Sequence, residues 1–120
     1  MLYRLIRSFG YAIEGIFYML ATQRNARIEA VIGVIIVAVA TWLHVTPTQW
    51  AILILTIGVV LAAEAMNTAI ERMTDLLSPE KQASAKHAKD AAAGAVLLVS
   101  LAAIGVGIAV LGPLLFAKFF

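Results

Sequence analysis

Five polar side chains recur along one segment of the chain, directly after a long uncharged run. No charged residue occurs from Gln49 to Ala63, and the polar residues that recur at helical spacing after this run are Glu64, Asn67, Thr68, Glu71 and Asp75. At about 100° per residue, these positions fall within an arc of roughly 100° on a helix, so they form a polar stripe on an otherwise apolar surface. If the stripe served only to hold helices together, the Asn67 amide and the Thr68 hydroxyl would suffice without the three carboxylates. Carboxylates inside a membrane helix are costly and mark functional sites.

The polar stripe carries the side-chain types that phosphate chemistry requires. Mg²⁺ commonly binds one or two carboxylates together with substrate phosphates, a role that suits Glu71. Glu64 lies deeper in the helix and suits a general base that takes a hydroxyl proton. The Lys89 ammonium could bind phosphates as a point charge. A solvated ion pair at the end of a helix would also explain Lys89 and Asp90. No phosphate-binding glycine-rich loop occurs, so any nucleotide site must be built from helices.

The elements that must position these residues are membrane helices. Of the 120 residues, 62% are hydrophobic and 13% are charged, and the mean hydropathy is +0.95. A soluble domain would carry about a quarter charged residues. The chain has no cysteine, which excludes a disulfide framework and a thiolate nucleophile. The sequence predicts an all-α integral membrane protein with one domain, residues 1–120.

Apolar periodicity predicts four helices. An amphipathic helix over 2–20 would lie in the membrane interface, and apolar runs predict spanning helices over about 29–45, 47–77 and 84–111. Thr46 and Pro47 form an N-cap pair that begins the second span, and Gly112-Pro113 is expected to end or kink the third. Three spans are too few to enclose a site, so we expect the polar stripe to face a neighbouring subunit.

Basic residues lie almost entirely on one side of the predicted membrane. Of the 9 Lys and Arg residues only Lys118 lies on the other side; the rest are Arg4, Arg7, Arg24, Arg27, Arg72, Lys81, Lys86 and Lys89. The positive-inside rule then predicts a cytoplasmic N-terminus and a cytoplasmic loop after the second span. Glu71 and Asp75 would lie at the cytoplasmic interface, and Glu64 about 10 Å deeper.

Several motifs of the chain resemble a known family. Residues 64–71, Glu-Ala-Met-Asn-Thr-Ala-Ile-Glu, and residues 85–90, Ala-Lys-His-Ala-Lys-Asp, are similar to the signature of the prokaryotic diacylglycerol kinase and undecaprenol kinase family. Asp75, Ser78-Pro79, the segment from Arg24 to Ile28 and the leading Arg4 and Tyr11 also match at compatible spacings. The resemblance covers nearly the whole chain.

The resemblance implies a homotrimer in the bacterial inner membrane, whose chains each have three spans and an N-terminal interfacial helix. Its active sites would lie between protomers and transfer the γ-phosphate of ATP, with Mg²⁺ as cofactor, to a lipid hydroxyl. The expected partners are ATP, a membrane lipid and further copies of the chain; nucleic acid is not among them. Asn67-Thr68 and the Arg24–Ile28 segment look like the undecaprenol branch, which favours undecaprenol over diacylglycerol.

Carried over by position, the resemblance makes Glu64 the general base and Glu71 a metal ligand, with Asn67 and Asp75 supporting the site. The expected ATP contacts are Arg4, Tyr11, Glu71, Glu80, Gln82, Lys89 and Asp90. Gln23 is a departure, because well-known family members have a second metal-binding Glu at that position. A neutral amide oxygen still binds Mg²⁺ but with less charge. We hypothesise that Glu29, which stands where many relatives have His, compensates in part.

Two other classes of function remain open from the residues alone. A small oligomeric proton-coupled transporter would also need a membrane-embedded Glu and small residues in its helices, but it would not need Lys89 and Asp90 beside the polar stripe. An inert assembly subunit would tolerate Glu64→Gln and Glu71→Gln without loss of function, which separates it from both the kinase and the transporter.

Overall fold

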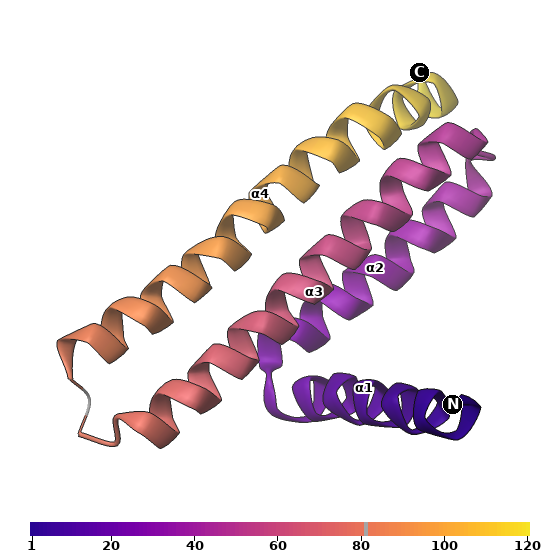
Figure 1. The fold of residues 1–120 in the computed structure, drawn as a ribbon. Helices are drawn as coiled ribbons and strands as arrows, with labels where there is room; N and C mark the ends of the chain where they lie inside the picture. The colour runs from indigo at the N-terminus through magenta and orange to yellow at the C-terminus, as the bar shows by residue number, and fades with distance from the viewer. Residues whose placement is uncertain (81) are drawn as a thin grey trace.

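The structure is a computed structural model, and it describes residues 1–80 and 82–120. These residues form the helices α1 (Leu2–Thr22), α2 (Arg24–Trp42), α3 (Pro47–Leu77) and α4 (Ala83–Phe119). The helices α2, α3 and α4 run alongside one another with alternating direction, and α1 lies at a steep angle to them at one end (Figure 1). Each of α2, α3 and α4 is long and apolar enough to cross a membrane. This confirms the predicted fold of one amphipathic helix and three apolar ones.

The ends of two spanning helices differ from those we expected. α2 begins at Arg24 instead of near residue 29, since only Gln23, with extended φ and ψ of −108° and 114°, separates it from α1. α4 does not end near Leu111 but continues through Pro113 to Phe119. Apolar membrane helices tolerate proline because neighbouring groups satisfy the backbone group that it frees. Lys81, one of the basic residues used for the orientation, lies outside the described residues.

The joint between α1 and α2 is closed by an arginine. The Arg27 guanidinium donates hydrogen bonds to the backbone oxygens of Leu20 and Ala21, at 2.8 and 3.0 Å. Carbonyl groups in the last turn of a helix lack partners within the helix, so this contact stabilises the end of α1. As a result the chain turns sharply at Gln23, and α1 leaves the direction of the other helices.

α3 begins at a capping box. The Thr46 hydroxyl accepts from the backbone N–H of Gln49 at 3.2 Å, and the Gln49 side chain accepts from the backbone N–H of Thr46 at 2.9 Å. Pro47 occupies the first turn, where its missing N–H costs nothing. The predicted start of the second span is therefore confirmed.

Small residues bring α2 and α3 together. A Cβ atom on Gly33 would lie 3.2 Å from Cγ2 of Ile57, so only glycine allows this approach without a shift. At the far end of the bundle, Ala40, Val45, Leu53 and Leu111 form a buried apolar cluster that joins all three helices. This packing holds Gln23, directly before α2, and Glu29, in the second turn of α2, beside the polar stripe of α3.

Candidate active site

Three of the five side chains of the polar stripe are buried within the single chain. Glu64, Thr68 and Asn67 are only 2%, 4% and 9% exposed. The Thr68 hydroxyl donates to the backbone oxygen of Glu64 at 2.8 Å, so Thr68 does not engage the Glu64 carboxyl. We expected this stripe to face a neighbouring subunit. In the structure α2 and α4 already cover much of it, because both pack along α3.

Glu71 lies at the centre of a small cluster of oxygen-bearing side chains. Its carboxylate accepts a hydrogen bond from Nδ2 of Asn67 at 3.3 Å and one from Nε2 of Gln23 at 3.5 Å. The contact with Gln23 joins the start of α2 to α3, far apart in the sequence. The structure therefore brings together Gln23, Asn67 and Glu71.

This cluster has the donor chemistry that a magnesium site needs. The Oδ1 atom of Asn67 is buried and has no hydrogen-bond partner, an unusual state for an amide oxygen. Together with the Glu71 carboxylate and the Gln23 amide, it offers oxygen ligands of the kind that Mg²⁺ prefers. Across residues 1–80 and 82–120, no group of three or more His, Cys, Asp or Glu side chains could hold a metal ion. A single carboxylate with two amides suits a cation that also binds substrate phosphates.

Two ion pairs among the described residues lie where α3 ends and α4 begins. Lys89 on α4 reaches Asp75 on α3 at 2.7 Å, and Lys86 reaches Asp90 at 2.5 Å within α4. These side chains are largely exposed, and exposed ion pairs contribute little to stability. The pair of Lys89 and Asp75 nevertheless holds an ammonium group next to the polar stripe, where it is accessible to an anionic molecule from the aqueous side.

The other nucleotide-contact candidates lie on the surface. Arg4 and Tyr11 are exposed on α1, and the Tyr11 hydroxyl accepts a hydrogen bond from Arg7 at 2.7 Å. Within the described residues, neither Arg4 nor Tyr11 hydrogen-bonds a carboxylate of α3. Glu80 and Gln82 are exposed on either side of residue 81, between α3 and α4. The single chain does not gather these four residues around the polar stripe.

Glu29 lies beside Ser100 and Glu64, and its compensation for Gln23 stays a prediction. Its Oε1 atom accepts a hydrogen bond from the Ser100 hydroxyl at 3.1 Å, and its carboxyl interacts directly with that of Glu64. It thus joins the buried base candidate rather than the hydrogen-bonded cluster around Glu71. Sequence reasoning missed Ser100 altogether. Its only signal was a lone hydroxyl in the apolar run from Ala91 to Leu111.

Comparison with known proteins agrees with the resemblance seen in the sequence. Residues 10–111 match the family model described as prokaryotic diacylglycerol kinase. A diacylglycerol kinase of Synechocystis is 44% identical over 110 residues, which cover 91% of this chain and 63% of the relative. An undecaprenol kinase of Bacillus subtilis is 33% identical over 110 residues, covering 92% of this chain and 89% of that protein.

A diacylglycerol kinase of Escherichia coli is 30% identical over 101 residues, which cover 84% of this chain and 83% of the relative. The chain therefore spans 63% of the Synechocystis protein but more than four fifths of the other two relatives. Together with the three apolar helices, these matches establish a membrane protein.

Proposed function

We propose that this chain, which belongs to the prokaryotic diacylglycerol kinase family, is a membrane lipid kinase that transfers the γ-phosphate of ATP to a lipid hydroxyl. One observation carries the proposal beyond family membership. A buried carboxylate, Glu64, lies on the same face of α3 as the cluster of Gln23, Asn67 and Glu71. This arrangement supports a role for Glu64 as a proton acceptor next to a set of oxygen ligands.

In the proposed reaction, Glu64 accepts the proton of the lipid hydroxyl. The hydroxyl oxygen forms a bond to the γ-phosphorus of ATP, the bond from that phosphorus to the bridging oxygen breaks, and ADP leaves with the electron pair. Burial keeps bulk water from Glu64, which would favour transfer to the lipid hydroxyl over hydrolysis of ATP. Lys89 neutralises phosphate charge at the aqueous end of the polar stripe.

Glu71, Gln23 and Asn67 would hold Mg²⁺ through oxygen atoms. When bound, the cation supplies positive charge to the phosphates of ATP. Rotation of the Asn67 and Gln23 amides would turn their oxygens toward the cation, while the Glu71 carboxylate already points into the cluster. Asp90, Arg4, Tyr11, Glu80 and Gln82 are proposed to contact the nucleotide, and Asp75 to position Lys89.

The proposed lipid is undecaprenol rather than diacylglycerol. The preference rests on Asn67-Thr68 and on the Arg24–Ile28 segment, which look like the undecaprenol branch. The relatives carry both names, so the family alone is compatible with either substrate. We further propose a homotrimer in a bacterial inner membrane with the N-terminus in the cytoplasm, on the basis of the family resemblance and the bias of basic residues.

The test is phosphate transfer from γ-labelled ATP by the purified protein in mixed micelles. Undecaprenol and diacylglycerol are offered in parallel, and Glu64→Gln is compared with Glu14→Gln, the same substitution on the exposed surface of α1. The proposal predicts label in undecaprenol, lost in Glu64→Gln and kept in Glu14→Gln. Label in diacylglycerol alone would overturn the substrate assignment but not the kinase. A folded protein that labels neither lipid would refute the kinase and favour a proton-coupled transporter.

A further inference from the structure

The end of α1 meets α3 at two neighbouring points. The Cζ atom of Arg72 lies 5.3 Å from the centroid of the Tyr18 ring, a distance at which a guanidinium is attracted to an aromatic face. Arg72 directly follows Glu71, whose carboxylate accepts a hydrogen bond from Nε2 of Gln23 at 3.5 Å. The same short segment at the end of α1 therefore contacts two consecutive residues of α3, one of them in the proposed magnesium site.

The attachment of α1 to α3 depends on the last residues of α1. Met19 is the only buried residue of this helix, and Tyr18 immediately precedes it. Arg72 makes no hydrogen bond or ion pair within residues 1–80 and 82–120, so no polar partner there draws its guanidinium away from the Tyr18 ring.

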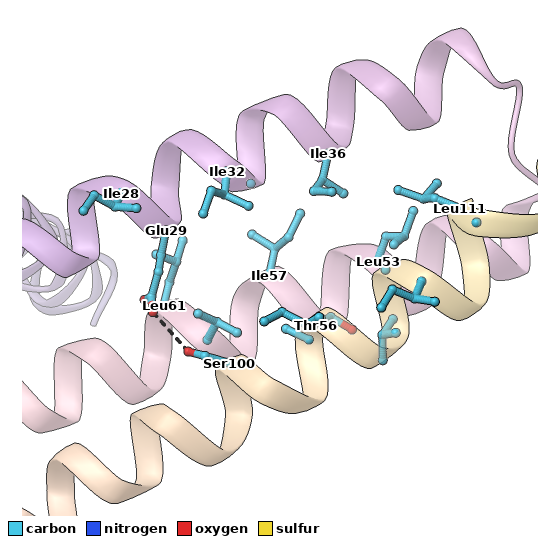
Figure 2. A pocket seen from close by; sticks show the side chains of 18 of the residues that line it. Ile28, Glu29, Ile32, Ile36, Leu53, Thr56, Ile57, Leu61, Ser100 and Leu111 are labelled. Atoms are coloured by element: carbon cyan, nitrogen blue, oxygen red, sulfur yellow. Dashed lines mark hydrogen bonds between the residues drawn. The ribbon is translucent and has the colours of Figure 1, made fainter. Parts of the chain in front are cut away.

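The packing of α2 by itself fixes Gln23 only in part. Asn25, Ile28 and Glu29, in the first two turns of α2, line a cavity of about 650 Å³ between α2, α3 and α4, and the last two side chains point toward it (Figure 2). Side chains that line a cavity lack partner atoms on that side. The close approach of α2 to α3 at Gly33 lies ten residues after Gln23, about 15 Å along the helix. Contacts from α1 therefore add to the position of Gln23.

A neutral amide depends on its position more than a carboxylate does. A carboxylate attracts a cation over many ångströms, whereas an amide dipole attracts it only at short range. Gln23 must therefore be in place before the cation arrives. Its hydrogen bond to Glu71, at 3.5 Å, is longer than is typical and is a weak constraint by itself.

We propose that Arg72 and Tyr18 are positioning residues, whose cation–π contact holds the end of α1 against α3 and so keeps the Gln23 amide at the magnesium site. The inference rests on the proposed function, because that function gives Gln23 its role as a ligand. Arg72 and Tyr18 touch neither the cation nor the nucleotide and act through Gln23. The contact offsets, by placement, the negative charge that Gln23 lacks.

The first experiment measures amide hydrogen exchange at the end of α1, in the full chain in detergent micelles without Mg²⁺. Tyr18→Leu should lower the protection of residues 20–23 about twofold to fivefold, the size expected for one exposed cation–π contact. Tyr18→Phe keeps the aromatic face and should keep the protection. Arg7→Met removes contacts of the same type, with Tyr3 and Tyr11 of α1 itself, and should leave residues 20–23 unchanged. Unchanged protection in Tyr18→Leu would overturn the attachment.

The second experiment measures the Mg²⁺ concentrations at which activity and the shift of the thermal midpoint of unfolding are half-maximal. Tyr18→Leu should raise both about twofold to fivefold and leave kcat at saturating Mg²⁺ unchanged, and Tyr18→Phe should change neither. Arg72→Met should also raise both, although the loss of a positive charge beside Glu71 would by itself lower them. No change in Tyr18→Leu, or a decrease in Arg72→Met, would overturn the positioning role.

A double substitution tests whether the contact acts through Gln23. Gln23→Met removes the amide oxygen, so Tyr18→Leu in that background should cause no further rise in the Mg²⁺ requirement. Additive effects would show that Tyr18 acts by another route and would overturn the proposal. If the exchange and thermal measurements behave as expected in a protein that transfers no phosphate, the positioning role stands and the proposed kinase function is refuted.

Discussion

At Glu71 both side-chain hydrogen bonds come from neutral amides, those of Gln23 and Asn67. A cation bound in this cluster would therefore meet one negative charge from the protein. Because Mg²⁺ gives up its water ligands reluctantly, its affinity for such a site depends strongly on ligand charge and on the phosphates that arrive with it. The identity of residue 23 should thus control how much Mg²⁺ the protein requires.

We predict that Gln23→Glu lowers the Mg²⁺ concentration for half-maximal activity, by about tenfold if the added carboxylate acts as a ligand. Without Mg²⁺ the same change should lower the thermal midpoint of unfolding, since two carboxylates would then lie within contact distance. Titration of activity and of thermal unfolding with Mg²⁺ measures both effects. Gln23→Met, which keeps the side-chain length but removes the oxygen, should shift the Mg²⁺ requirement upward. A Gln23→Glu protein with unchanged Mg²⁺ dependence would contradict this role.

The residues of α3 could be predicted from sequence because they depend on one helix. Glu64, Asn67 and Thr68 share a face by periodicity alone, and the structure buries all three. Ser100 could not be predicted in this way, because its importance arises from a contact with Glu29, 71 residues away in the chain. For the same reason the sequence did not separate Glu29 from the cluster around Glu71.

Among the elements, the joint between α1 and α2 has the greatest influence on the site. Gln23 is both the only extended residue between these helices and the side chain that reaches Glu71. Arg27 fixes the joint through its two hydrogen bonds to the end of α1. The sequence predicted one helix over 2–20 and the next from about 29, but not this short joint, since helix ends depend on capping contacts that periodicity does not reveal.

We predict that Arg27→Met lowers the free energy of unfolding by about 1 kcal/mol, because it removes the guanidinium that caps α1 but keeps the apolar stem. It should also raise the Mg²⁺ requirement, since Gln23 would lose its fixed position. Thermal unfolding in detergent and Mg²⁺ titration check both outcomes. Arg24→Met removes an equal charge that makes no hydrogen bond or ion pair among the described residues, and we expect it to leave both quantities unchanged. If the two substitutions had equal effects, the cause would be the loss of a positive charge and not the loss of the cap on α1.

On the scale of the whole molecule, the single chain leaves many large apolar side chains exposed. Leu97, Leu98 and Leu101 on α4 are 60%, 70% and 57% exposed. Lipid or further copies of the chain would cover such a surface in a membrane. Arg4, Tyr11, Glu80 and Gln82 also remain apart from the polar stripe within one chain. An active site completed by neighbouring protomers, as the family resemblance implies, would account for both features.

We predict that native mass spectrometry of the detergent-solubilised protein gives three copies of the chain. The trimer should persist in Glu64→Gln, because that change keeps the size and hydrogen-bonding capacity of the side chain. An active monomer would contradict the assembly, since a single chain would then suffice to gather the nucleotide contacts. Dissociation of the trimer by Glu64→Gln would instead assign the polar stripe a structural role.

The central claim is that Glu64 takes the proton of a lipid hydroxyl, and the most direct test separates chemistry from binding in Glu64→Gln. The measurement is single-turnover phosphate transfer to undecaprenol, together with the Kd for ATP in the same micelles. We predict a fall in the transfer rate of about a hundredfold to ten-thousandfold, with the Kd for ATP unchanged, as expected for loss of a general base. A normal transfer rate, or a loss confined to ATP affinity, would contradict the claim.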